Sequence, residues 1–259
     1  MDLSLMRSVL LEVVKAAGAL VKAGFDTEYE ISHKDGINNL VTEIDKASER
    51  FIVDTLKSSF PDHGFIGEEF GNTNETADFK WVIDPIDGTV NFAHKVPLCC
   101  VSIALAYKEE VLLGAVYNPM MDELFFAEKG KGATLNGKPI RVSQKTDINT
   151  AFLVTGFPYH FPDTKIHPLE IFTKVVSKGL PVRRLGSAAL DLCWVACGRF
   201  DAFWEYNLQP WDIAAGYLIV EEAGGRVTDF NRAAYTIRDK ETLATNAVLH
   251  EAMLHLLFS

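Results

Sequence analysis

The 259-residue sequence has few cysteines and no apolar run long enough to cross a membrane. Asp2 comes early and no basic stretch precedes an apolar core, so no signal peptide is expected. The four cysteines do not indicate the disulfide framework of a secreted protein. Cys193 and Cys197 could supply half of a soft-metal site, but no matching pair of His or Cys residues is evident. We therefore expect buried thiols and a reducing, cytoplasmic location.

Basic side chains are also in deficit, with 25 Lys and Arg against 35 Asp and Glu and a net charge of −10. This balance argues against a nucleic-acid-binding or anionic-membrane surface. An acidic pocket should repel a phosphate monoester unless bound cations reverse the local charge. A hydrophobic content of 48% supports a sizeable core. The length fits one large unit or two fused lobes.

A short acidic segment follows a strongly apolar run. Residues 81–83 are Trp-Val-Ile, a pattern typical of a buried strand. Asp84 and Asp87 come next, on a turn that contains Pro85 and Gly88. Pro85 favours an extended Asp84, and Gly88 allows a turn that a Cβ would obstruct. Two carboxylates on a stiff turn indicate a hard-cation site, although a turn with two solvated aspartates gives the same pattern.

Three segments together carry a resemblance to a known family. Residues 84–89, Asp-Pro-Ile-Asp-Gly-Thr, resemble the metal-binding signature of the inositol monophosphatase family, which are Mg²⁺-dependent phosphomonoesterases in a superfamily with the fructose bisphosphatases. Gly-Glu-Glu at 67–69 and Trp-Asp-Ile-Ala-Ala-Gly at 211–216 match two further segments in the expected order. The resemblance runs from about Lys34 to Gly225.

Periodicity alone supports a mixed α and β fold, whereas the resemblance implies an α+β protein, a layered α/β/α/β/α sandwich. We expect one phosphatase unit, with a β-rich lobe at about 1–150 and an alternating lobe at about 151–259. The expected helices cover an N-terminal segment ending at Gly24, about 43–59, 167–178, 188–197 and a segment from Pro210 to Gly224. The expected strands are 65–67, 98–107, 111–117, 123–127, a hairpin at 136–137, 152–154, 182–185 and 200–205.

Several of the candidate residues have a purely structural interpretation. Thr42 and Asp45 resemble a capping box, and Ser187 is placed to cap the helix at 188–197. Asp212 lies in the first turn after Pro210, where the helix dipole favours an acid. Glu68 and Glu69 are adjacent in a strand, so only one of them can face the aspartates, and the resemblance selects Glu68.

The chemistry of the acidic residues favours Mg²⁺, which takes oxygen ligands, over zinc, since no His-rich or Cys-rich set competes. The resemblance implies two ions and assigns ligands to both. One ion would be held by Glu68, Asp84 and the Ile86 carbonyl, and the other by Asp84, Asp87 and Asp212. It also implies that Thr89, held by Asp45, and Glu68 position the attacking water.

The substrate contacts are likewise implied by the resemblance. They are Asp87, Gly88, Thr89, Gly186, Ser187, Ala188, Glu205 and Asp212. Lys34 matches a family lysine on a flap over the site. Gln209 and Asn39 depart from residues common in the family, which bears on substrate preference rather than on hydrolysis. Of Arg183 and Arg184, which could bind a second phosphate, at most one should reach the site.

The leading hypothesis is hydrolysis of inositol monophosphate to inositol and phosphate by a metal-activated water. Hydrolysis of fructose 1,6-bisphosphate or of a nucleotide 3′-phosphate is the alternative within the superfamily, and a regulatory binding protein on the same fold is the alternative of another class. The expected partner is a small phosphorylated polyol or sugar, with no nucleic acid and no membrane. The resemblance implies a homodimer and inhibition by Li⁺.

Overall fold

The computed structural model describes residues 2–33, 39–158, 167–233 and 235–258. Lys34, expected on a flap, lies outside the described residues. Within the described ranges, no helix combines the length and the apolar character needed to cross a membrane.

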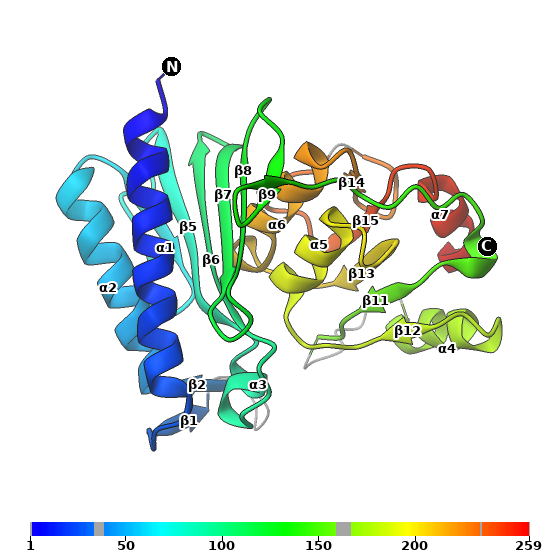
Figure 1. Cartoon of the computed structure of the whole chain (residues 1–259), viewed down its shortest axis with the longest axis horizontal. Coiled ribbons are helices and arrows are strands. Elements are labelled where there is room, and N and C mark those ends of the chain that lie inside the picture. Colours follow the sequence, from blue (N-terminus) through cyan, green and yellow to red (C-terminus); the bar gives the residue numbers. More distant parts are fainter. Residues whose placement is uncertain (1, 34–38, 159–166, 234, 259) are drawn as a thin grey trace.

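A large, mainly antiparallel sheet carries the acidic segment (Figure 1). Its strand order is β10-β9-β8-β7-β6-β5-β3-β4, and β3 and β5 are the parallel neighbours. These strands are β3 (Gly64–Gly67), β4 (Gly71–Thr73), β5 (Phe79–Asp87), β6 (Cys100–Tyr107), β7 (Glu110–Asn118), β8 (Glu123–Glu128), β9 (Ala133–Leu135) and β10 (Lys138–Pro139). A separate pair, β1 (Ile31–His33) and β2 (Leu40–Thr42), lies near the short helix α3 (Thr89–Ala93).

A second sheet of five strands has the order β12-β11-β13-β15-β14. Its central strand β13 runs parallel to β11 and antiparallel to β15. The strands are β11 (Leu153–Thr155), β12 (Val182–Arg183), β13 (Ala202–Tyr206), β14 (Arg226–Thr228) and β15 (Glu241–Thr245). A 3₁₀ turn at Ile148–Thr150 precedes β11.

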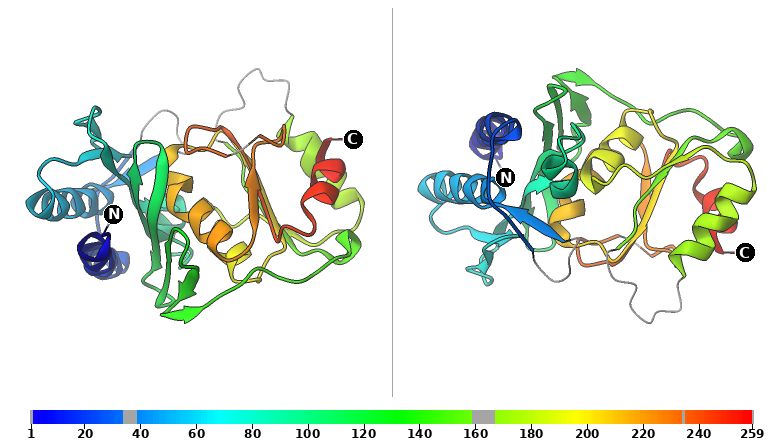
Figure 2. Two further views of the ribbon diagram at one scale, coloured as in Figure 1. Left: turned by 90° about the horizontal axis from the view of Figure 1, so that it is seen from above. Right: turned by 90° about the horizontal axis from the view of Figure 1, so that it is seen from below.

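The helices form three layers around the two sheets (Figures 1 and 2). The first pair packs on the outer face of the large sheet, the second pair lies between the sheets, and the third covers the far side of the small sheet. This arrangement confirms the expected α/β/α/β/α sandwich. The pairs are α1 (Ser4–Phe25) with α2 (Glu43–Ser59), α5 (Ala188–Ala196) with α6 (Pro210–Glu222), and α4 (Pro168–Ser177) with α7 (His250–Phe258).

The side chains of strand β5 pack alternately into two different hydrophobic cores. Trp81 and Ile83 pack with α1 and α2, whereas Val82 points to the other face and joins the core around α5 and α6. Successive strand residues face opposite ways, so an unbroken apolar run is what a sheet covered on both faces requires. The same alternation sends Cys99 and Cys100 into different cores, as free buried thiols.

Most expected elements are present, and three details were wrong. Helix α1 continues past Gly24 to Phe25, and Gly24 is a position of close packing instead of a cap, since an added Cβ would lie 2.8 Å from Ile44 Cδ1. The strand expected at 182–185 is only Val182–Arg183. Ser187 precedes α5 without capping it through its side chain. The prediction stopped before β14, β15 and α7.

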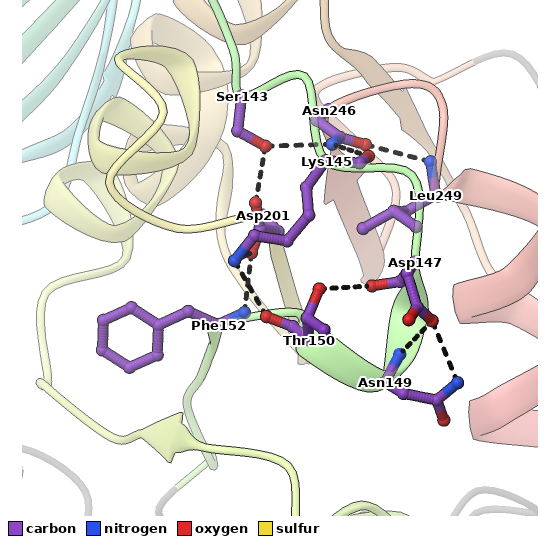
Figure 3. A network of polar contacts seen from close by, with 9 residues as sticks. All are labelled: Ser143, Lys145, Asp147, Asn149, Thr150, Phe152, Asp201, Asn246 and Leu249. Carbon is purple, nitrogen blue, oxygen red and sulfur yellow. Dashed lines mark hydrogen bonds and ion pairs between the residues drawn. The ribbon is translucent and has the colours of Figure 1, made fainter.

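A buried carboxylate secures the segment that links the two sheets (Figure 3). Asp201, just before β13, accepts hydrogen bonds from Ser143 Oγ at 2.5 Å and Phe152 N at 2.6 Å. Lys145 Nζ lies 3.0 Å from the same carboxylate. Asn246 Nδ2 donates to Ser143 Oγ and to the Lys145 carbonyl, each at 2.9 Å. The link is thereby tied to both strands at one end of the β13–β15 pair.

A buried histidine joins α7 to the small sheet. His250 is 0% exposed, with Nδ1 2.9 Å from Thr245 Oγ1 and Nε2 3.0 Å from Thr228 Oγ1. A neutral imidazole has one donor and one acceptor, and a hydroxyl can serve either. Burial, followed by the nearby charge of Arg226, lowers the pKa of His250 from 6.5 to about 4.

The lowered pKa predicts acid sensitivity of the fold. Between about pH 6.5 and 4 the unfolded histidine binds a proton that the folded one does not, so stability is full above this window and falls through it. At about 1.36 kcal/mol per pKa unit, His250 accounts for a loss of up to about 3 kcal/mol. Denaturant unfolding at pH 4.5 and 7 should show a smaller pH dependence for His250→Gln than for wild type. Equal slopes in the two proteins would contradict this assignment, and His63, whose pKa burial also lowers, contributes equally to both.

Candidate functional site

An acidic pocket opens where the carboxyl end of β5 meets α5, α6 and β13. Its wall carries five acidic side chains and one basic one, Arg184, among the residues that the structure describes. The acidic residues come from four segments of the chain, and two of these residues share the end of β5. They are Glu68, Asp84, Asp87, Glu205 and Asp212.

The two aspartates of the turn end strand β5, and both are buried. A register shift between Asp84 and Asp87 breaks the pairing with β6, which lets both side chains reach the pocket instead of alternating across the sheet. Ile86 N donates to Asp84 Oδ1 at 3.1 Å. Asp87 Oδ2 accepts from Ser187 Oγ and from Ala189 N, each at 2.7 Å.

Burial and like charges act together on these carboxyls. Asp84 is 2% exposed, and burial, followed by the charges of Glu68, Asp87 and Asp212, raises its pKa well above the usual range. The pKa of Asp87 rises to about 6 through burial, offset in part by the bonds from Ser187 and Ala189. Burial and Asp87 likewise raise the pKa of Asp212 well above normal. The arrangement therefore disfavours full ionisation without a compensating positive charge.

Glu68 directly follows β3, and its backbone N–H donates to Ile83 O of the parallel strand β5 at 3.3 Å. Glu68 lines the pocket and Glu69 does not. Both residues lie in the turn after β3, so the strand alternation expected for this pair was wrong, although only one of the two lines the pocket. The next two amides, Glu69 N and Phe70 N, donate to the carboxylate of Glu49 at 2.8 and 2.9 Å. Glu49 belongs to α2, so this helix holds the turn that presents Glu68.

Asp45 combines the two roles that the sequence offered. Its Oδ2 accepts from Thr42 N at 2.9 Å, and Asp45 N donates to Thr42 Oγ1 at 3.3 Å, which completes the expected capping box. Its Oδ1 lies 2.9 Å from Thr89 Oγ1, which is also 3.0 Å from Ile86 O. Burial raises the pKa of Asp45 to about 6, although bonds from Thr42 and Thr89 act against it.

Asp212 is a helix cap as well as a pocket residue. Gln209 N donates to Asp212 Oδ2 at 2.7 Å at the start of α6, and Pro210 occupies the first turn. Lys240 Nζ donates to Gln209 Oε1 at 2.8 Å. The expected stabilising role of Asp212 is thus real, and it fixes the carboxylate at the pocket.

Glu205 faces the pocket from β13. Gly156 makes room for it, because an added Cβ there would lie 2.0 Å from Glu205 Oε2. Burial, followed by the charge of Asp212, raises the pKa of Glu205 to about 8, and Arg184 acts in the opposite direction. Arg184 lines the pocket, whereas Cζ of Arg183 lies 5.1 Å from the centre of the Phe152 ring. One arginine therefore reaches the site, which agrees with the prediction of at most one.

Two backbone turns meet beside the aspartates. Gly88 has φ +93, and an added Cβ would lie 2.8 Å from Leu98 O and 3.2 Å from Gly186 O. Only glycine combines that φ with so close an approach. Thr89, Ser187 and the other predicted contact residues of these turns, Gly186 and Ala188, line the pocket, as does Asn39.

The donor set fits a hard divalent cation. Glu68, Asp84, Asp87 and Asp212 offer only oxygen atoms, and Cys100, beside Asp87, is a buried thiol whose pKa burial raises well above normal. Among the residues described, no three His, Cys, Asp or Glu side chains already converge on one point. The carboxylates share the pocket wall, and a bound cation would have to draw them together against their mutual repulsion.

Sequence reasoning missed two residues around the pocket, Glu49 and Asp191, and it did not foresee the hydrogen bond that Ser187, a predicted substrate contact, makes with Asp87. Glu49 was four residues from Asp45 on a predicted helix, a spacing that places both on one face. Ser187 was expected as a helix cap, and its hydroxyl instead serves Asp87. Asp191, 1% exposed on α5, has an Oδ1 without a hydrogen-bond partner in the described structure. No local sequence pattern marks Asp191 as a pocket neighbour, because it lies among the apolar residues of its helix.

The comparisons with known proteins agree with the geometry. The family model described as the inositol monophosphatase family matches residues 2–258. Inositol monophosphatase 2 of Solanum lycopersicum is 43% identical over 96% of this chain and 96% of its own. The Nus factor SuhB of Escherichia coli is 42% identical over 96% and 94%. The crystal structure of the extragenic suppressor protein suhB of Bartonella henselae superposes with a TM-score of 0.92 at 36% identity, covering 98% of both chains.

The crowding of carboxyls predicts a site that costs stability until a cation binds. Asp84→Asn should raise the melting temperature in EDTA, because it removes one repelling charge. For wild type, a cation at one hundred times its Kd adds about 2.7 kcal/mol, or roughly 5–10 °C. Asp84→Asn should lose most of that shift in a Mg²⁺ series.

Asp191→Asn is the matched control for this melt. It removes another buried carboxyl whose pKa burial and the charge of Glu205 raise, but one outside the pocket wall. Asp191→Asn should raise the melting temperature in EDTA and keep the full Mg²⁺-dependent rise in melting temperature. If wild type shows no shift, or Asp84→Asn shifts as much as wild type, then Asp84 does not ligate the ion.

Proposed function

Because the chain belongs to the inositol monophosphatase family, we propose that it hydrolyses phosphate monoesters, with inositol monophosphate as the preferred substrate and Mg²⁺ as the cofactor. One observation carries this proposal: four carboxylates from three segments of the chain line one pocket, with Arg184 as the one basic side chain on the described wall. Such a pocket repels a phosphate unless cations are bound, and its oxygen donors are those that Mg²⁺ takes.

The proposed ligands are those that the resemblance assigned. Glu68, Asp84 and the Ile86 carbonyl would hold one ion, and Asp84, Asp87 and Asp212 the other. Bound Mg²⁺ supplies positive charge to the phosphate oxygens and lowers the pKa of a coordinated water. Asp87 is fixed for this role by Ser187 and Ala189, which occupy its Oδ2.

Thr89 and Glu68 would position the attacking water. Asp45 Oδ1 is within reach of the Thr89 hydroxyl proton, which leaves lone pairs of Thr89 Oγ1 to accept a hydrogen bond from water. Glu68 would accept the proton that this water loses. A new P–O bond then forms, the ester P–O bond breaks, and the leaving alcohol oxygen takes up a proton. No phosphoenzyme is required.

The substrate's hydroxyls would meet the other wall of the pocket. Glu205 is held there beside Gly156 and Arg184. Ionised, it accepts hydrogen bonds from ring hydroxyls, and protonated, it both donates and accepts. The turn at 186–188 closes the pocket next to Gly88 and the phosphate side.

We also propose that the two expected lobes act as one unit, since the pocket draws Asp84 and Asp87 from the large sheet and Glu205 from the small one. Homodimer formation and inhibition by Li⁺, which could replace an ion at Asp84, Asp87 and Asp212, remain predictions from family membership.

Glu68→Gln tests the assigned base. An amide neither binds the cation well nor accepts a proton, so kcat should fall more than about a hundredfold. Phosphate release from inositol 1-phosphate in saturating Mg²⁺ measures the loss. Glu69→Gln, one residue further and outside the pocket wall, is the control and should retain wild-type kcat. An active Glu68→Gln enzyme would remove Glu68 from the mechanism.

Glu205→Ala tests substrate recognition. Inositol phosphate offers ring hydroxyls to Glu205 and a simple aryl phosphate does not. Loss of a hydrogen bond to Glu205 costs about 0.5–1.5 kcal/mol when the carboxyl is protonated and about 1.5–3 kcal/mol when it is ionised, so kcat/KM should fall roughly 2- to 150-fold, and only for the inositol ester. The measurement is kcat/KM for both substrates with both proteins. Equal losses on the two substrates would show a structural role for Glu205.

A further inference from the structure

A buried carboxylate on α2 anchors the turn that presents Glu68. Glu49 is 0% exposed, and each of its oxygens takes one backbone amide: Oε2 from Glu69 N at 2.8 Å and Oε1 from Phe70 N at 2.9 Å. These two residues connect β3 to β4, and the pairing of Gly67 with Gly71 closes the turn. A side-chain carboxylate therefore fills a turn whose amides point inward, a place suited to an anion.

The surrounding residues leave this contact little freedom. An added Cβ at Gly67 would lie 2.2 Å from Glu49 Oε1, so the backbone approaches the carboxylate as closely as glycine allows. The guanidinium of Arg50 lies 5.5 Å from the centre of the Phe70 ring. Before the turn, Glu68 N is bonded to Ile83 O. The backbone of Glu68 is thus fixed on one side by β5 and on the other by Glu49.

We propose that Glu49 is a positioning residue for the reaction, which holds the Glu68 carboxylate at the cation and water site through the backbone of residues 69 and 70. This inference rests on the proposed function. It assigns α2 a single face with three contacts to the site: Asp45 to Thr89 Oγ1, Ser48 Oγ to Pro85 O at 3.3 Å, and Glu49 to the turn. Helical spacing places residues 45, 48 and 49 on that face.

Removing the charge of Glu49 should displace Glu68 without touching the substrate. In Glu49→Gln the amide oxygen can accept one N–H, but the NH₂ group meets the other donor. We expect kcat to fall about tenfold to a hundredfold, as for a small misplacement of a reacting group, with an unchanged KM. The Mg²⁺ concentration for half-maximal activity should rise.

The chain offers a matched control. Glu222, at the end of α6, also takes two backbone amides of a turn, Gly130 N and Gly132 N, each at 2.7 Å. Glu222→Gln removes the same kind of contact from a turn on the β8–β9 side of the large sheet. It should keep wild-type kcat, KM and Mg²⁺ dependence, even where its melting temperature falls.

Amide hydrogen exchange without Mg²⁺ gives a readout independent of activity. The peptide covering residues 67–73 should exchange faster in Glu49→Gln than in wild type or Glu222→Gln, because the amides lose their partner. If Glu49→Gln does not fold, Glu49→Asp, which keeps the charge on a shorter side chain, takes its place with the same expected kcat loss and unchanged KM.

The possible outcomes distinguish the positioning role of Glu49 from the proposed phosphatase function. Wild-type kcat and Mg²⁺ dependence in a folded Glu49 variant, or a loss matched by Glu222→Gln, overturns the positioning role and leaves the proposed function intact. Wild-type protein that releases no phosphate from any ester in Mg²⁺ overturns the proposed function itself.

Discussion

The structure depends on holding several carboxylates close together in a buried place. Asp84 is the extreme case, since burial and three neighbouring acids all oppose its ionisation. Marginal stability of a few kcal/mol leaves little room for such a site unless it is fixed from outside. Hydrogen bonds from surrounding residues hold the carboxylates of Asp84, Asp87 and Asp212, and the turn that presents Glu68 is held through its backbone.

Those fixing contacts come from helix α2 on one side of the large sheet and from α5 and α6 on the other. Helix α2 contributes Asp45 and Glu49, α5 contributes the amide of Ala189, and α6 holds Asp212 through the amide of Gln209. Backbone amides recur because they are donors that cannot rotate away. The same contacts build secondary structure: the Asp45 bond is a helix cap and the Glu49 bonds close a hairpin. Stability and site geometry therefore rest on the same atoms.

The sequence predicted the local elements well, because these depend on neighbours in the chain, and the family resemblance named the acidic residues that line the pocket. The apolar run before Asp84, the capping box at Thr42 and Pro210 at the start of α6 all took their expected form. It failed where a side chain chooses between a local and a distant partner. Ser187 bonds Asp87 a hundred residues away instead of capping its helix, and no local pattern contains that information.

The two walls of the pocket differ in their side chains and in how firmly these are held. The wall from the large sheet, with Glu68, Asp84 and Asp87, is fixed by dense contacts, and a change there alters the charge balance of the whole cluster. The wall with Glu205 and Arg184 carries polar groups that do not take part in that balance to the same degree. Gln209 and Asn39 differ from the residues common in the family at these positions, but all the acidic residues of the pocket are present. We propose that substrate preference varies along the second wall, while hydrolysis depends on the acidic residues of the first.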